Sequence, residues 1–153
     1  MHPELAEISF LVGTWAGSGR GTYPTIHPFD YEEEVTFVAP PGKPFLAYTQ
    51  RTRSPEGAPL HAEAGYLRPA GPGLVELVIA QPSGIVEVHH GTVTGRRLHL
   101  RSDLVGLTRT AKRVDSVERV VWVKGGVLRY ELDMAAVGQP HQLHLDAELR
   151  RTG

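Results

Sequence analysis

The sequence predicts an all-β protein: a single antiparallel up-and-down β-barrel of about ten strands, preceded by a short N-terminal helix. Short runs rich in Val, Leu, Ile, Tyr and Thr recur along the chain, and Pro- and Gly-rich turns separate them at regular intervals. No segment sustains a long apolar period of 3.6 residues. The 153 residues fit one domain, residues 1–153, which is long enough to bury a closed core.

The elements follow in order. The one plausible helix covers residues 3–11, and a glycine-rich strand begins at Gly13. The β-type runs after it are Glu33–Val38, Phe45–Arg51, Leu74–Ala80, Gly84–Val93, Arg97–Ser102, Val117–Val123 and Val127–Met134. The last two form the clearest hairpin, because Gly125 and Gly126 supply the positive φ of a tight turn. Apolar and charged residues alternate in its second arm, so we expect one face of that arm to be buried.

Composition and charge exclude several function classes. With 16 basic and 17 acidic residues the net charge is −1, so neither nucleic acid nor an anionic membrane is an expected partner. The absence of cysteine excludes disulfides and thiolate ligands. No apolar run approaches the roughly 20 residues that span a bilayer, and the acidic N-terminus does not resemble a secretory signal. We therefore expect a cytoplasmic protein, and the sequence leaves a homodimer open.

The stretch GTWAGSGRGTYPT, residues 13–25, resembles a phosphate-binding loop only superficially. A dinucleotide fingerprint must open a helix within a βαβ unit, whereas Tyr23-Pro24 and β-type sequence follow here. On an extended strand Gly13, Trp15, Gly17 and Gly19 share one face. We expect the glycines to allow close approach of a neighbouring strand or a flat ligand, and Trp15 to fill one end of the barrel.

The same stretch belongs to a set of motifs that spans nearly the whole chain. They are Gly13-x-Trp15-x-Gly17-x-Gly19, the run 21–26 (GTYPTI), Phe29-x-Tyr31-x-Glu33-Glu34, the runs 60–68 (LHAEAGYLR) and 84–88 (GIVEV), Met134-Ala135, and His144-Leu145-x-Ala147-x-Leu149. Together they resemble the nitrobindin family of haem-binding β-barrels. The G-x-W pattern alone is weaker, because lipocalins and fatty-acid-binding proteins share it.

The resemblance implies a haem protein that binds nitric oxide and isomerises peroxynitrite to nitrate. It implies one haem b per chain, with His144 as the proximal ligand of the iron and His61 on the distal side. Ferric iron with an open sixth position would act as a Lewis acid on peroxynitrite. The resemblance also places Thr25 at the haem edge, beside one propionate. Lys112 or Arg113, in a polar loop, could pair with the other propionate.

The strand pattern around His144 conflicts with its expected role. On an ideal strand His144 shares a face with Asp146 and Glu148, while Leu143, Leu145, Ala147 and Leu149 form the apolar face. Either a bulge re-aims the imidazole, or the haem lies at the barrel mouth. Alternatively, His141 and His144 could bind zinc, although a spacing of three suits a helix better than a strand.

Other ionisable residues fit ordinary strand positions. The adjacent residues His89 and His90 should point to opposite faces, and His99 should occupy an exposed position. Glu33 and Glu34 should also point apart, which disfavours a carboxylate pair acting together.

A carrier without catalytic chemistry is the alternative function. A lipocalin-like or fatty-acid-binding-like barrel would hold an apolar small molecule, and the G-x-W strand is compatible with it. Carriers of carboxylated lipids usually place an Arg in the cavity, and the pattern forces no Arg of this chain inward. A visible spectrum after hemin addition distinguishes the two functions.

Overall fold

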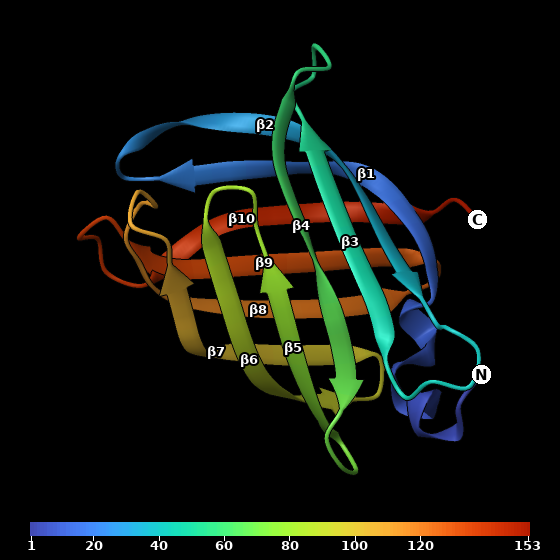
Figure 1. Cartoon of the computed structure of the whole chain (residues 1–153). Coiled ribbons are helices and arrows are strands. Elements are labelled where there is room, and N and C mark those ends of the chain that lie inside the picture. Colours follow the sequence, from blue (N-terminus) through green and yellow to red (C-terminus); the bar gives the residue numbers. More distant parts are fainter.

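The computed structural model describes all residues, 1–153, and its strands form a closed antiparallel barrel (Figure 1). Each strand pairs with its neighbours in sequence, and β1 also pairs with β10, so the sheet has no free edge. The strands are β1 Gly13–Tyr23, β2 Ile26–Val38, β3 Leu46–Arg53, β4 Pro59–Pro69, β5 Leu74–Ala80, β6 Ile85–Thr94, β7 Arg97–Leu107, β8 Val114–Lys124, β9 Val127–Ala136 and β10 Gln142–Arg151. The predicted fold class is confirmed. No helix has the length and apolar character needed to cross a membrane.

The predicted N-terminal helix is a 3₁₀ helix, η1, over Pro3–Leu11. The His2 side chain accepts a hydrogen bond from the Glu4 amide, and Pro3 supplies a preset φ at the first position. Leu5, Ile8 and Leu11 are buried, because this element lies across one end of the barrel (Figure 1).

Trp15 fills that same end, as expected. Its side chain is fully buried, and its Nε1 donates a hydrogen bond of 2.9 Å to the Leu11 carbonyl. The Arg151 guanidinium lies 4.2 Å from the centre of the indole ring. This contact joins the last strand to the first, so the two chain ends secure the barrel together.

The strands extend beyond several of the predicted runs. β2 begins at Ile26 rather than Glu33, β7 continues to Leu107, and β8 begins at Val114. These added segments contain polar or turn-forming residues that suggest loops, but neighbouring strands satisfy their backbone groups. The hairpin of β8 and β9 is confirmed, with φ values of 58° and 77° at Gly125 and Gly126.

The glycines of β1 allow the close approach that the sequence predicts. A Cβ atom at Gly17 would lie 2.1 Å from the Glu148 carbonyl oxygen, and one at Gly19 would lie 2.3 Å from the Tyr31 ring. Both are impossible contacts. The first glycine thus brings β1 against β10 where the barrel closes, and the second leaves room for an aromatic side chain from β2.

The interior has three zones from one end to the other. Next to η1 the side chains are apolar and tightly packed, with Trp15, Leu46, Leu67, Leu98 and Leu149 almost fully buried. A polar layer follows, which consists of Glu33, Gln50, Glu63, Glu87, His89 and Arg119. Beyond it lies the end formed by the turns β1–β2, β3–β4, β5–β6, β7–β8 and β9–β10, opposite η1 in Figure 1. We call the two ends the η1 end and the His144 end.

Candidate functional site

His144 is the extra residue of a β-bulge in β10. Leu143 pairs with Asp133 and Leu145 pairs with Leu132, which leaves His144 without a partner on β9. The bulge shifts the strand by one residue, so Leu145 no longer shares a face with Leu143 as it would on an ideal strand. The sequence leaves two explanations for the conflicting strand pattern at His144, a bulge or a haem at the barrel mouth. The structure contains the bulge.

The bulge directs the imidazole toward the end of β1. His144 Nδ1 donates a hydrogen bond of 3.0 Å to the Thr22 carbonyl, and the ring meets Tyr23 edge-on at 5.4 Å between centroids. Because Nδ1 carries the proton, the lone pair of a neutral ring is on Nε2, which has no partner within the protein. Burial lowers the pKa of His144, against the opposing effect of the Thr22 carbonyl. A neutral imidazole with a free Nε2 is a suitable axial donor for haem iron.

His61 lies at the same end, near the start of β4. Its Nε2 is 3.3 Å from Glu63 Oε2, and its positive form would further lower the pKa of His144. The side chain remains 37% exposed. The His61 ring is therefore accessible to solvent, and the buried Glu63 carboxylate fixes its orientation through Nε2.

The polar layer centres on Arg119, an inward-facing arginine that the strand pattern does not single out. Arg119 Nη1 is 2.7 Å from Glu63 Oε1, and Nη2 is 3.0 Å from Glu87 Oε1, with only 11% of the side chain exposed. Tyr48 donates a 2.6 Å hydrogen bond to Glu63, and His89 Nε2 lies 2.7 Å from Glu87. Burial opposes ionisation of both glutamates, but Arg119 and these hydrogen bonds hold the pKa of each below its ordinary value.

Glu33 occupies the other side of the layer. Gln50 Nε2 and the Tyr130 hydroxyl donate hydrogen bonds of 2.7 Å to its two oxygens. Burial raises the pKa of Glu33 to about 7 and outweighs both hydrogen bonds. Glu34 instead faces outward and pairs with Arg51 at 3.0 Å, so these adjacent carboxylates point apart as predicted.

Three buried polar atoms of the layer have no hydrogen-bond partner within the protein: Gln50 Oε1, His89 Nδ1 and Arg119 Nε. Buried polar atoms are normally satisfied by protein or by ordered water. Ordered water could hydrogen-bond to these three atoms. An apolar ligand in the same place would leave them without a partner.

The residues expected at the propionates lie in turns of the His144 end. Thr25 is exposed in the β1–β2 turn, two residues after Tyr23. Lys112 and Arg113 are exposed between β7 and β8, where Arg113 pairs with Asp115 at 2.8 Å. All three stand at the rim rather than inside the barrel.

The remaining histidines separate as the strand pattern predicts. His89 is fully buried, whereas His90 is exposed and lies 2.6 Å from Asp103. His99 lies partly exposed on the outer wall and contacts Glu118. His141 contacts Glu118 and Ser116, whereas His144 contacts Thr22 and Tyr23, so these two rings do not face a common site.

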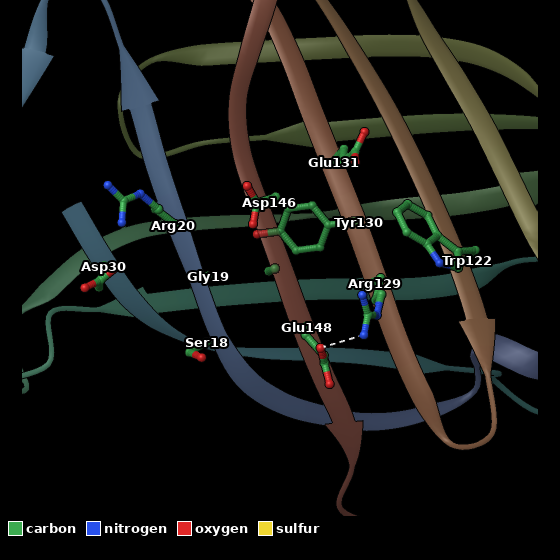
Figure 2. Close-up of a pocket in the computed structure, with 11 residues that line it drawn as sticks. Ser18, Gly19, Arg20, Asp30, Trp122, Arg129, Tyr130, Glu131, Asp146 and Glu148 are labelled. Atoms are coloured by element: carbon green, nitrogen blue, oxygen red, sulfur yellow. Dashed lines mark ion pairs between the residues drawn. The ribbon is translucent and has the colours of Figure 1, made fainter. Parts of the chain in front are cut away.

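Figure 2 shows a depression of about 380 Å³ in the wall where β1, β9 and β10 run side by side. It is largely polar, and Arg129 and Glu148 form an ion pair across it at 2.9 Å. Its lining residues are Ser18, Gly19, Arg20, Asp30, Trp122, Arg129, Tyr130, Glu131, Asp146, Ala147 and Glu148. None of the histidines is among them, so this depression does not include His61 or His144.

Sequence reasoning missed the polar layer, although part of its signal is visible. Arg119 shares a strand face with Val117, Val121 and Val123, which are inward residues of β8. In the run 84–88 the polarity is reversed, because Val86 is exposed and Glu87 is buried. The partners come from β4, β6 and β8, so no local pattern indicates that the charges meet.

Comparisons with known proteins agree with this architecture. Residues 4–151 match the model of the THAP4-like, heme-binding beta-barrel domain. The chain is 53% identical to "Peroxynitrite isomerase 2" of Mycobacterium avium, over 99% of this chain and 96% of that protein. It is 54% identical to "Peroxynitrite isomerase 1" of Mycobacterium tuberculosis H37Rv, with the same coverage.

A solved structure gives the same result for the fold. The crystal structure of Rv2717c from M. tuberculosis superposes with a TM-score of 0.93 at 51% identity, and the match covers 100% of this chain and 99% of that one. The resemblance to nitrobindins is confirmed, and the chain belongs to the family of THAP4-like haem-binding β-barrel domains.

Proposed function

We propose that residues 1–153 act as one unit that binds a single haem b at the His144 end and isomerises peroxynitrite to nitrate. The observation that carries the proposal is the bulge at His144, which presents a neutral imidazole with an unpartnered Nε2. The peroxynitrite isomerase names of relatives at 53–54% identity support the reaction.

The contacts of His144 support this role. The Thr22 carbonyl fixes the tautomer and makes the imidazole a stronger donor, while Tyr23 limits rotation of the ring. Burial keeps the ring neutral at pH 7 because it disfavours the charged form. When bound, ferric haem supplies a Lewis-acidic iron with one open coordination position for nitric oxide or peroxynitrite.

His61 would stand on the opposite, distal side. Glu63 accepts a hydrogen bond from His61 Nε2, which leaves Nδ1 to face a bound ligand. Arg119 and Tyr48 hold Glu63 in turn, so His61 is positioned by a rigid network rather than by a loop. Isomerisation needs no external electron or co-substrate, and this site requires only that the ligand be oriented and its developing charge be hydrogen-bonded.

The rim residues would hold the propionates. Thr25 offers a hydroxyl and Lys112 an ammonium group, both exposed at the His144 end. Lys112→Ala should weaken hemin binding more than Arg113→Ala, because Asp115 already pairs with Arg113. Equal losses would remove Lys112 from this role.

Hemin titration of the purified protein tests the cofactor and its ligand. We expect a Soret band that saturates at one hemin per chain, and loss of that coordinated spectrum in His144→Ala. His90→Ala is the matched control, because His90 is an exposed imidazole paired with a carboxylate elsewhere on the barrel. The absence of a Soret band in the wild-type protein would overturn the haem proposal.

Stopped-flow mixing with peroxynitrite tests the reaction. The ferric protein should accelerate peroxynitrite decay and raise the yield of nitrate, whereas the haem-free protein and His144→Ala should not. Decay at the haem-free rate, together with a normal Soret band and nitric oxide binding, would leave only a haem-based carrier of nitric oxide.

The polar layer argues against a lipid carrier, the alternative from the sequence. Such a barrel needs an apolar cavity and an available cation for the carboxylate. Here the Arg119 guanidinium already pairs with Glu63 and Glu87, so it is not available to a lipid carboxylate. The polar layer also crosses the interior where an acyl chain would lie. We therefore expect no saturable binding of fatty acids, which displacement of a fluorescent fatty acid measures.

A further inference from the structure

We propose that Glu118, Asp133 and His141 form a zinc-binding site on the outer wall of the barrel. Their ligand atoms all lie within 4.8 Å of one another. Glu118 and Asp133 are direct partners across β8 and β9, and His141 ends the β9–β10 turn. The site uses none of the residues that contact His144.

The distances suit a tetrahedral ion. His141 Nε2 lies 3.0 Å from Glu118 Oε1 and 4.0 Å from Asp133 Oδ2. Zinc binds nitrogen and carboxylate oxygen at about 2.0–2.2 Å, so its ligand atoms lie roughly 3.3–3.5 Å apart. The two distances bracket this value, and small side-chain rotations would complete the site. Solvent can supply the fourth ligand, because His141 is 40% exposed.

The surrounding side chains orient the ligands as they do in known zinc sites. Ser116 Oγ lies 3.3 Å from His141 Nδ1 and can fix the tautomer that leaves Nε2 free. His99 Nε2 contacts Glu118 Oε2, the oxygen that does not face His141. Metal-binding imidazoles and carboxylates usually have such outer partners, and their loss costs about 10–100-fold in metal affinity.

Charge also favours a divalent cation, with one competitor. Glu118 and Asp133 bring two negative charges, which would neutralise Zn²⁺. Arg101 Nε lies 3.4 Å from Glu118 Oε2 and would oppose the ion. Its side chain is 66% exposed and can turn to solvent, so we expect Arg101 to weaken binding without preventing it.

The site would fasten the β9–β10 turn to the barrel wall. Only two residues separate His141, which lies outside, from His144, so the turn and the bulge are close in the chain. This turn contains Val137 at φ 46°, a conformation that is strained for a β-branched residue. A bound ion would hold this turn in place.

Isothermal titration of the full-length, chelator-treated protein with zinc chloride tests the site. We expect one zinc per chain, and at least a tenfold loss of affinity in both His141→Ala and Glu118→Gln. Ser116→Ala should lose about tenfold, while Arg101→Ala should bind severalfold more tightly. His90→Ala and His144→Ala should bind as the wild type does.

Cobalt substitution adds a second readout, because tetrahedral coordination gives intense visible bands that an octahedral aquo ion lacks. Near-UV circular dichroism should show that each variant is folded. Absence of saturable zinc binding in the wild type would overturn the proposal, and so would unchanged affinity in Glu118→Gln and His141→Ala. Loss of the site in His144→Ala would instead assign the zinc to the His144 end.

Discussion

The two ends of this barrel have opposite designs. At the η1 end a helix covers the opening, Trp15 fills it, and leucines from several strands pack around the indole. At the His144 end five turns surround the opening, and His61 and His144 are only partly buried. The polar layer separates them. Stability should therefore depend on the first end and ligand chemistry on the second, and the polar layer should matter to both.

The largest effect on stability is expected from Trp15→Ala. Removing a fully buried indole leaves a cavity and deprives the Leu11 carbonyl of its donor, which should cost about 3–5 kcal/mol. Urea denaturation of the haem-free protein measures the loss. The folded fraction should still bind hemin with wild-type affinity, and a parallel loss of hemin affinity would show that the two ends are coupled.

Arg119→Ala should destabilise by about 3 kcal/mol or more, because it leaves the buried Glu63 and Glu87 without the guanidinium that balances their charge. Adding Glu63→Gln should recover part of the loss, so the two changes would not be additive. Denaturation of both single variants and the double variant measures the coupling. Additive losses would mean that the guanidinium and the carboxylate do not interact energetically.

Glu33 should give the polar layer a pH dependence of its own. Its pKa is about 7 in the folded protein and 4.5 ordinarily, so folding favours its protonated form. Its stabilising effect is complete below about pH 4.5 and is lost as the pH rises toward 7, by up to about 3 kcal/mol. His144, whose folded pKa is lowered, acts in the opposite direction below about pH 6.5.

Comparison with Glu33→Gln isolates the carboxyl group from His144. The difference in unfolding free energy between wild type and variant should fall as the pH rises from 4.5 to 7, and should then level off. A difference that stays constant over this window would show that Glu33 ionises at its ordinary pKa.

The smallest effect is expected from His144→Ala in the haem-free protein. The ring is half-buried and makes one hydrogen bond to the Thr22 carbonyl, so its loss should cost about 1 kcal/mol. Thermal unfolding without hemin measures this loss of stability, and thermal unfolding with hemin measures the stabilisation that hemin binding adds. Hemin should stabilise the wild type and not the variant, and stabilisation of both would place the ligand elsewhere.

The sequence predicted most of the fold because alternation and turn residues are local signals. The β8–β9 hairpin and the fully buried Trp15 could be read directly. The polar layer could not, because its residues break the rule that inward positions are apolar. Their burial is tolerable only when Glu63, Glu87 and Arg119 meet, and these residues lie on strands far apart in the chain.

His144 shows what the sequence could and could not predict about the site. The motif identified it through the family resemblance, while the alternation of β10 assigned it to the outer face. Strand geometry resolves the conflict only through the pairing of Leu143 and Leu145 with β9, which depends on tertiary register. Residue types alone therefore point to the proposed ligand without indicating how its side chain reaches the interior.

The bulge in β10 acts as a change of phase within one strand. After it, Ala147 and Leu149 stay in the core while Glu148 stays outside and pairs with Arg129. A regular strand without the bulge could direct His144 inward only if Glu148 also turned inward and Ala147 and Leu149 turned outward. Because His144 is the single extra residue of the bulge, its orientation does not depend on the inward–outward alternation of its neighbours. We expect insertions or deletions here to be far more damaging than substitutions, because each would exchange the faces of a strand that closes the barrel.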